Sequence, residues 1–340
     1  MFSSKNEIRE LFLGFTGLKV LIAGDVMIDT YLRGTVDRIS PEAPVPVVTL
    51  HQRENLLGGA ANVALNIHSL GATPLLCSVI GNDQQGDAFL QLLGNAGIGT
   101  TGILRCADRI TTTKYRIIGN KTQMLRVDEE TDTDLENKQE TSLLKKIGEI
   151  IQVEKPDVII LQDYNKGVLT PLVIEGTIQL ALNNQIPVVV DPKKKNFLAY
   201  HHITLFKPNL KEIREGLKIS VDPEVADSLR AASRLIHEGQ DAQMVMITLS
   251  DRGVFISHRN NSTFNSDMIR AHLRLIADVS GAGDTVISVA SLCIARKLAP
   301  DSMAVLANLA GGLVCEHVGV VPVDKESLLT EACLLLSGNK

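Results

Sequence analysis

The segment 278–285, Asp-Val-Ser-Gly-Ala-Gly-Asp-Thr, combines two glycines with two carboxylates. An apolar stretch of helical length follows, so the segment is predicted to open a buried helix. The first amides of a helix have no partners within it, and glycines let an anion approach them. Asp284, in the first turn, could accept a proton. The segment is suited to phosphoryl transfer to a hydroxyl, and the alternative is an aspartate that only caps the helix.

Composition excludes several other classes of function. The 340 residues are 44% hydrophobic, which is enough for a large core. The net charge of −5 and the few aromatic residues argue against nucleic-acid binding, and no apolar run is long enough to cross a bilayer. Five scattered cysteines without a CxxC motif indicate reduced thiols, so we expect a cytoplasmic protein that binds neither nucleic acid nor membrane.

Predicted strands and helices alternate along most of the chain, which indicates a mostly parallel sheet covered on both faces. Two segments, 31–55 and 103–127, are instead polar and β-branched. They are predicted to form one small β-sheet that lies over the core as a lid. We therefore expect a single α/β domain over residues 1–340, with the lid formed by these two insertions.

Short polar residues follow several predicted strands, at the sheet edge where α/β proteins bind ligands. They are Asp29, Asn82, Asp83, Asp163, Asp191, Asn209 and Ser250. Each could equally be a helix cap. A GxGxxG pattern at 97–102 follows a predicted helix, which is the wrong context for a dinucleotide site, and GxxxxGK[ST] does not occur.

Two separated motifs resemble the signatures of the ribokinase-like, or PfkB, sugar kinases. The segment 58–62, Gly-Gly-Ala-Ala-Asn, is similar to the N-terminal sugar-binding signature. The segment 278–284 is similar to the C-terminal DTxGAGD signature, with Val279 and Ser280 where threonines are frequent. The resemblance covers nearly the whole chain. It implies a ribokinase-like three-layer α/β/α fold and an ATP-dependent carbohydrate kinase.

One branch of the family is especially similar, through the segments 24–29 and 37–48. These are the D-glycero-β-D-manno-heptose 7-phosphate kinases, which phosphorylate the anomeric O1 and so contribute to the ADP-heptose of lipopolysaccharide. Such kinases are often fused to a C-terminal nucleotidyltransferase. Because the sequence ends at Lys340, we expect the stand-alone form, with adenylylation by a separate protein.

The resemblance implies a role for each matching residue. Asp284 would be the base, with the amides of Gly281, Ala282 and Gly283 as the phosphoryl cradle. The residues implied to bind sugar hydroxyls are Asp29, Gly58, Gly59 and Asn62. Those implied to bind ATP are Asn209, Leu210, Lys211, Glu212, Thr248, Ser250, Gly253 and Asn308. Glu212 would organise Mg²⁺ through the phosphates, and Asp278 would hold a monovalent cation such as K⁺.

Both expected ligands are anionic while the chain is acidic, so basic side chains must gather locally. The candidates are Arg33, Arg38, Lys114, Arg116, Arg126 and residues 193–195. Of these, Arg126 and Lys193 are predicted to bind the sugar phosphate. Open lid edges favour a homodimer. Two alternatives remain: a PfkB kinase for another sugar phosphate or a nucleoside, and a catalytically silent sugar-binding regulator.

Overall fold

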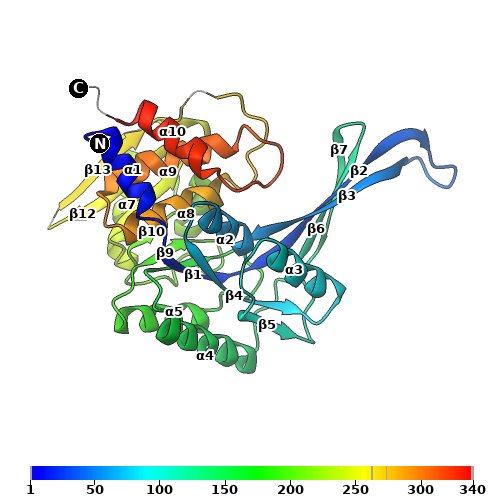
Figure 1. Cartoon of the computed structure of the whole chain (residues 1–340), viewed down its shortest axis with the longest axis horizontal. Coiled ribbons are helices and arrows are strands. Elements are labelled where there is room, and N and C mark those ends of the chain that lie inside the picture. The colour runs from blue at the N-terminus through cyan, green and yellow to red at the C-terminus, as the bar shows by residue number, and fades with distance from the viewer. Residues whose placement is uncertain (1, 262, 273, 338–340) are drawn as a thin grey trace.

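A nine-stranded sheet forms the centre of the computed structural model, which describes residues 2–261, 263–272 and 274–337 (Figure 1). The strand order is β13-β12-β11-β10-β9-β8-β1-β4-β5. Neighbours are parallel from β11 to β5, and β12 and β13 are antiparallel additions at one edge. The predicted mostly parallel central sheet is therefore confirmed. The strands are β1 (Lys19–Gly24), β4 (Thr73–Gly81), β5 (Gly102–Cys106), β8 (Val158–Gln162), β9 (Val188–Asp191), β10 (Leu205–Phe206), β11 (Met244–Thr248), β12 (Val254–Asn260) and β13 (Thr263–Ile269).

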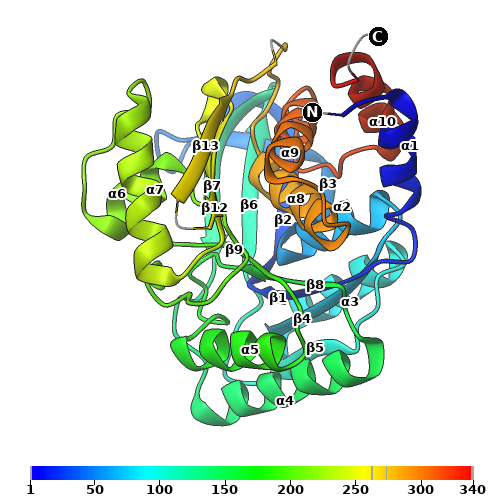
Figure 2. The same cartoon turned by 90° about the vertical axis from the view of Figure 1, so that its left-hand side faces the viewer.

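Helices cover both faces of this sheet (Figure 2). Successive side chains of a strand point to opposite faces, so Val20 and Ile22 of β1 enter one core while Leu21 and Ala23 enter the other. The first core lies under α1 (Lys5–Leu13), α2 (Ala60–Ser69), α3 (Gln84–Asn95), α8 (Ala282–Ala295), α9 (Pro300–Val314) and α10 (Lys325–Leu335). The second lies under α4 (Asn137–Glu154), α5 (Pro171–Asn183), α6 (Leu210–Leu217) and α7 (Ala226–Gln240). Among the described residues, no helix combines the length and the apolar character needed to span a membrane.

A second sheet of four strands projects from this body, and we call it the lid (Figure 1). Its order is β3-β2-β6-β7, with β2 (Val26–Ile39), β3 (Pro46–Gly59), β6 (Thr113–Gly119) and β7 (Thr122–Glu129). Asn120 and Lys121 both have positive φ, which suits the two-residue turn between β6 and β7. β2 and β3 are long enough to run from the body to the lid tip, so residues at their body ends can belong to the site.

The sequence prediction differs from the structure at the second lid segment. Residues 102–106 form β5, which pairs with β4 at the edge of the large sheet, and the lid strand β6 begins at Thr113. An edge strand is partly exposed, so its polar, β-branched composition resembles that of a lid strand. The strand β13 and the helix α10 were not anticipated from the sequence.

The loop after β8 is held from beneath by one buried carboxylate. Asp25 accepts hydrogen bonds from the backbone amides of Tyr164 (2.8 Å), Lys166 (3.0 Å) and Val168 (3.0 Å). Burial raises the pKa of Asp25, while these three amides oppose that effect. Gly167 has a φ of +81°, and a Cβ there would overlap the carbonyl oxygen of Thr133. The loop is thus fixed tightly at its base.

We expect Gly167→Ala to lower the free energy of unfolding by about 2–4 kcal/mol, because alanine strains the left-handed backbone and collides with Thr133. Gly239→Ala is the matched control, since a Cβ at that position of α7 would meet nothing within 4 Å. It should be neutral or stabilise by up to about 1 kcal/mol. Urea unfolding curves measure both. Equal effects of the two substitutions would contradict a rigid loop.

Candidate active site

The amino-terminal end of α8 forms a small concave anion cradle. Gly281 precedes the helix with a φ of +81°, a conformation that favours glycine. The amides of Gly283 and Asp284 find no hydrogen-bond acceptor among the described residues. A Cβ on Gly283 would lie 3.6 Å from the Nζ of Lys207, so a cation stands beside these free amides. Free amides, the helix dipole and an adjacent cation together suit a phosphate oxygen.

Asp284 lies buried at the edge of this cradle and accepts hydrogen bonds from three separate parts of the chain. The donors are Asn62 Nδ2 on α2 (2.7 Å), Gln162 Nε2 at the end of β8 (3.0 Å) and the Tyr164 hydroxyl (2.6 Å). Burial raises the pKa of Asp284 to about 6, although the bonds from Tyr164 and Asn62 oppose the shift. The carboxylate is therefore ionised at neutral pH and able to take up a proton.

Strand register explains why these groups meet. Gln162 lies opposite Gly24 of β1 on one side and Asp191 of β9 on the other, so three strands end at one level. The Gln162 amide reaches Asp191 Oδ2 at 3.3 Å. Lys207, one residue beyond β10, pairs with the same oxygen at 2.9 Å. A buried lysine is thereby kept at the strand ends beside the cradle.

A second charged cluster lies at the start of α6. Asn209 and Glu212 cap this helix reciprocally, with amide-to-side-chain distances of 2.8 and 2.9 Å. Lys193 forms an ion pair with Glu212. Burial raises the pKa of Glu212, and the charge of Asp191 adds to the shift. Although burial favours neutral Lys193, the carboxylates of Asp191 and Glu212 raise the pKa of Lys193, so the ammonium persists.

Asp29 marks the sugar-binding side expected from the sequence. It lies on β2 and forms an ion pair with Arg116 of β6, at the junction of body and lid. A Cβ on Gly58 would collide with the Asp29 carboxylate, so only glycine allows this approach. Gly59 caps α2 with a φ of 61°, and α2 carries Asn62 to Asp284. The two signatures, 222 residues apart, thus share one hydrogen bond.

The remaining residues predicted to bind nucleotide lie at the neighbouring strand ends. Thr248, the last residue of β11, bridges to Asn209. Ser250 and Gly253 both have positive φ and form the tight turn after β11. Asn308 of α9 donates to the carbonyl oxygen of Arg270 (2.9 Å). Leu210 and Lys211 form the first turn of α6.

Asp278 anchors the loop before the cradle. Its two carboxylate oxygens accept the amides of Ser280 and Gly319, each at 3.0 Å. Burial opposes ionisation, but these bonds lower the pKa of Asp278 overall. No set of three His, Cys, Asp or Glu side chains in the described ranges could hold a metal ion. The monovalent cation at Asp278 stays a prediction.

The structure does not bring together the two residues predicted to bind the sugar phosphate. Lys193 contacts Glu212 and lies 5.4 Å from the Tyr164 ring centroid. Arg126 is on β7, is about half exposed, and pairs with Asp128 (2.9 Å). Because a lid cation and a cation beside α6 face different surroundings, a shared role for them stays a prediction.

Sequence reasoning missed Gln162, Tyr164 and Lys207 as site residues. Asp163 was selected at the end of β8, but it turns toward the second core and accepts from Tyr200 (2.8 Å). Burial raises the pKa of Asp163 to about 6, with nearby Asp25 adding to the shift. The signal available in the sequence was the position of Gln162 and Tyr164 on either side of this strand-end carboxylate.

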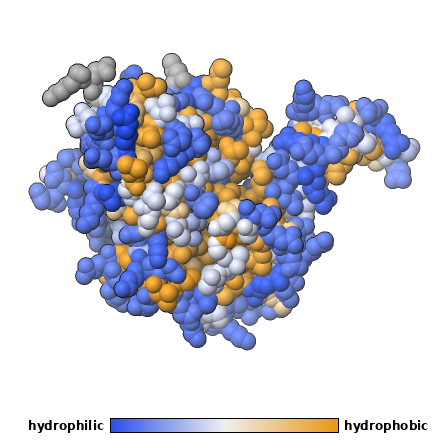
Figure 3. All heavy atoms as spheres, in the orientation of Figure 1, coloured by the Kyte–Doolittle hydropathy of each residue, from blue (hydrophilic) through white to orange (hydrophobic). Residues whose placement is uncertain are grey.

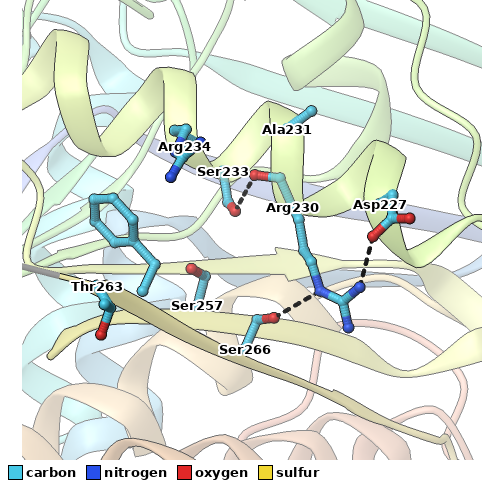
Figure 4. A pocket seen from close by; sticks show the side chains of 9 residues that line it. Asp227, Arg230, Ala231, Ser233, Arg234, Ser257, Thr263 and Ser266 are labelled. Carbon is cyan, nitrogen blue, oxygen red and sulfur yellow. Dashed lines mark hydrogen bonds and ion pairs between the residues drawn. The ribbon is translucent and has the colours of Figure 1, made fainter.

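A separate hollow of about 490 Å³ lies between α7 and the antiparallel strands β12 and β13 (Figure 4). Arg230 on its wall already pairs with Asp227 (2.6 Å) and contacts Ser266 (3.2 Å). None of the residues predicted to do chemistry lines it. The cradle at α8 is therefore the candidate active site.

A family model described as pfkB family carbohydrate kinase matches residues 18–326. A curated protein from Methylobacillus flagellatus, named Bifunctional protein HldE, is 37% identical over 95% of this chain and 66% of its own length. The protein of that name from Caulobacter vibrioides is 40% identical over 92% of this chain and 63% of its own length. The chain therefore spans slightly less than two thirds of these relatives.

Solved structures share the fold at low sequence identity. Phosphofructokinase-2 from Escherichia coli in complex with potassium has a TM-score of 0.75 at 18% identity, over 94% of this chain and 99% of that chain. Arabidopsis thaliana ribokinase complexed with ribose and ATP has a TM-score of 0.68 at 15% identity, over 93% of this chain and 98% of that chain.

If Asp284 is the base, Asp284→Asn should lower kcat by roughly 10²–10⁴, because the amide cannot take up a proton. Folding should persist, since the Tyr164 hydroxyl and the Gln162 carbonyl can both accept from the new amide. Steady-state kinetics and thermal unfolding measure the two effects. A variant that retains most of its kcat would contradict the assignment.

In the unaltered protein, kcat/KM should fall as the pH drops through about 6, where Asp284 becomes protonated.

Proposed function

The chain belongs to the pfkB family of carbohydrate kinases, and we propose that it uses ATP to phosphorylate the anomeric O1 of D-glycero-β-D-manno-heptose 7-phosphate. The observation that carries the kinase proposal is the Asn62–Asp284 hydrogen bond of 2.7 Å. It places the buried carboxylate between the sugar signature and the anion cradle. A base between a bound hydroxyl and a bound phosphoryl group is what the transfer requires.

In this proposal the residues of the chain divide the work between two ligands. Asp29, Gly58, Gly59 and Asn62 bind sugar hydroxyls and orient the acceptor toward Asp284. The amides of Gly281, Ala282 and Gly283, together with the free amide of Asp284, receive the oxygens of the transferring group, and Lys207 adds positive charge. The Ala282 amide also donates a long hydrogen bond to the Val279 carbonyl oxygen (3.4 Å). Preorganised donors of this kind act strongly because they are fixed before the reaction.

The nucleotide would lie over the strand ends beyond β10 and β11. Thr248, Ser250, Gly253 and Asn308 surround that region, and Asn209 to Glu212 face the phosphates. Both Glu212 oxygens already have protein partners, Lys193 and the Asn209 amide, which suits an indirect role through the phosphates. Mg²⁺, when bound with ATP, would neutralise charge that develops between the β- and γ-phosphates.

Relatedness supports the heptose substrate. The relatives named HldE are 34–40% identical over at least 91% of this chain. Segment 24–29, which resembles the heptose kinases, spans the end of β1 and the start of β2 beside the proposed sugar site. Segment 37–48, which also resembles them, spans the end of β2, the turn that follows and the start of β3 in the lid. On this proposal the product, a 1,7-bisphosphate, enters the synthesis of ADP-heptose for lipopolysaccharide.

Positive side chains on the lid support an anionic sugar. Arg33 and Arg116 both lie near the Tyr31 ring, 5.2 and 5.1 Å from its centroid. Arg116 also pairs with Asp29, so positive charge reaches the sugar site directly. Arg126 lies opposite Arg116 in the β6–β7 pair. We propose that this side of the lid recognises the 7-phosphate.

Exposed apolar side chains on the lid support a homodimer. Ile39, Leu50, Met124, Leu125 and Val127 are all at least 43% exposed. Figure 3 shows hydrophobic surface on the projecting lid. Because unpaired strand edges and apolar side chains favour association, a second copy would cover them. A cytoplasmic location is part of the same proposal.

We expect the purified chain to consume ATP with D-glycero-β-D-manno-heptose 7-phosphate at least tenfold faster, in kcat/KM, than with fructose 6-phosphate, ribose or a nucleoside. A hydrophobic or polar pocket mismatch commonly gives at least that discrimination. A coupled ADP assay measures the rates, and ³¹P NMR identifies the anomeric phosphate. A higher kcat/KM with another acceptor would contradict the proposed heptose substrate. No turnover with any acceptor would favour a catalytically silent sugar-binding protein.

We expect Arg126→Ala to raise the KM for heptose 7-phosphate by about tenfold while the KM for ATP changes by less than about twofold, because a charge-assisted bond to phosphate is lost. Arg105→Ala is the control, since Arg105 lies on β5 and pairs with Asp87 away from the lid. Both constants come from initial rates. An equal loss for the two ligands would exclude Arg126 from sugar phosphate recognition.

A further inference from the structure

The two oxygens of the Asp284 carboxylate have different surroundings. Oδ1 accepts two hydrogen bonds, from the Tyr164 hydroxyl (2.6 Å) and from Gln162 Nε2 (3.0 Å). Oδ2 accepts one, from Asn62 Nδ2 (2.7 Å). A carboxylate offers about two acceptor positions on each oxygen. The free acceptor position is therefore on Oδ2, and Oδ1 is already filled.

The Tyr164 hydroxyl donates to Asp284, since an ionised carboxylate can only accept, and the loop that carries Tyr164 is fixed. Its backbone amide is bound by Asp25, together with two other amides of the same loop. The Nζ of Lys193 lies 5.4 Å from the ring centroid, within the range of a cation–π contact. Burial raises the pKa of the Tyr164 phenol well above its ordinary value, and the nearby Asp284 charge adds to this. The phenol therefore keeps its proton throughout the working pH range.

Other charges also act on Asp284. Asp191 at the end of β9 opposes ionisation, and Lys207 after β10 favours it. Lys193 lies beyond the Tyr164 ring. The donors on α2 and β8, Asn62 and Gln162, are neutral amides. Tyr164 is thus the one titratable hydrogen-bond donor to this carboxylate among the described residues.

We propose that Tyr164 is a positioning residue for the transfer: its hydroxyl fixes the Asp284 carboxylate, so that Oδ2 faces the acceptor, and favours the ionised form. The inference rests on the proposed kinase function. In the step, the sugar oxygen forms a bond to the γ-phosphorus, the bond from that phosphorus to the bridging oxygen of ADP breaks, and the hydroxyl proton moves to Oδ2.

The test compares Tyr164→Phe with Tyr200→Phe. Tyr200 is a matched control because its hydroxyl also donates to a buried carboxylate, Asp163 (2.8 Å), on the far side of the same loop. Loss of a charge-assisted hydrogen bond destabilises the carboxylate, so Tyr164→Phe should move the acid limb of kcat/KM upward by about one pH unit or more. On the acid side of the shifted limb, kcat/KM of Tyr164→Phe should be about tenfold lower than that of the unaltered protein. At high pH the two values should agree. Tyr200→Phe should leave the limb in place.

A second measurement does not depend on turnover. ¹³C NMR of carboxyl-labelled aspartate, assigned through the signal lost in Asp284→Asn, follows the titration of Asp284 in the unliganded protein. Tyr164→Phe should raise that titration midpoint, and Gln162→Met, which removes the other donor to Oδ1, should raise it too. If no acceptor is phosphorylated but the midpoint still moves, the kinase proposal fails and the hydrogen-bond role stands.

Two results would overturn the inference. One is an unchanged titration midpoint and an unchanged acid limb in a folded Tyr164→Phe variant. The other is a lower KM for the sugar at an unchanged acid limb, which would show that the hydroxyl only occupies the place of the substrate. Thermal unfolding of each variant identifies loss of structure, so that the titrations and the acid limbs are compared between folded proteins.

Discussion

The buried Asp284 carboxylate depends on hydrogen-bond donors, because an ionised group removed from water must be compensated. The chain supplies three of them, from α2, from the end of β8 and from the loop that follows β8. None of these segments is near Asp284 in sequence, so the site exists only when the parallel sheet is complete. Its strand order sets β1 between β8 and β4, and the end of β8 and the helix α2 both reach Asp284. The hydrogen bonds that compensate Asp284 therefore form only in the folded chain.

A second buried carboxylate, that of Asp25 beneath the site, also needs hydrogen-bond donors to compensate for its removal from water. Within the described part of the chain, Asp25 has no ionic partner at hydrogen-bond distance, and three backbone amides of the 164–168 loop satisfy it instead. Those bonds fix the path of the loop and so the position of Tyr164. Asp163, between the two, faces the opposite core and is satisfied by Tyr200 and Asn196. The buried carboxylates of Asp25 and Asp163 therefore hold the backbone and side chains around the loop in place. Composition alone would not distinguish this polar layer from ordinary apolar packing.

Sequence reasoning predicted the fold and the part of the site that is local. Gly281, Gly283 and Asp284 form one helix start, and Gly58, Gly59 and Asn62 form another, so short-range patterns were sufficient. Tyr164, Gln162 and Lys207 become site residues only through strand register and loop path, which no local pattern encodes. β5 resembled a lid strand because edge strands share that composition, and β13 was missed because its half-exposed residues give a weak apolar signal. The assignment of Lys193 with Arg126 rested on charge alone, which does not specify a location.

The strands β2 and β3 run from the residues proposed to bind sugar hydroxyls to the lid tip, with register shifts after Arg33 and Val36. At their body ends they pair Asp29 with Leu56 and Met27 with Gly58. We call the position of these two cross-strand pairs the seam between the body and the lid. On its body side lie Asn62, Tyr164 and Asp284, with all of their mutual hydrogen bonds, and on its outer side lie the lid arginines. Exchange of the outer part, together with the separate β6–β7 ribbon, would replace Arg116 and its ion pair with Asp29 but would leave the three hydrogen bonds to Asp284 in place. If the lid arginines recognise the phosphate of the acceptor as proposed, this part of acceptor preference can change without altering the hydrogen bonds of Asp284.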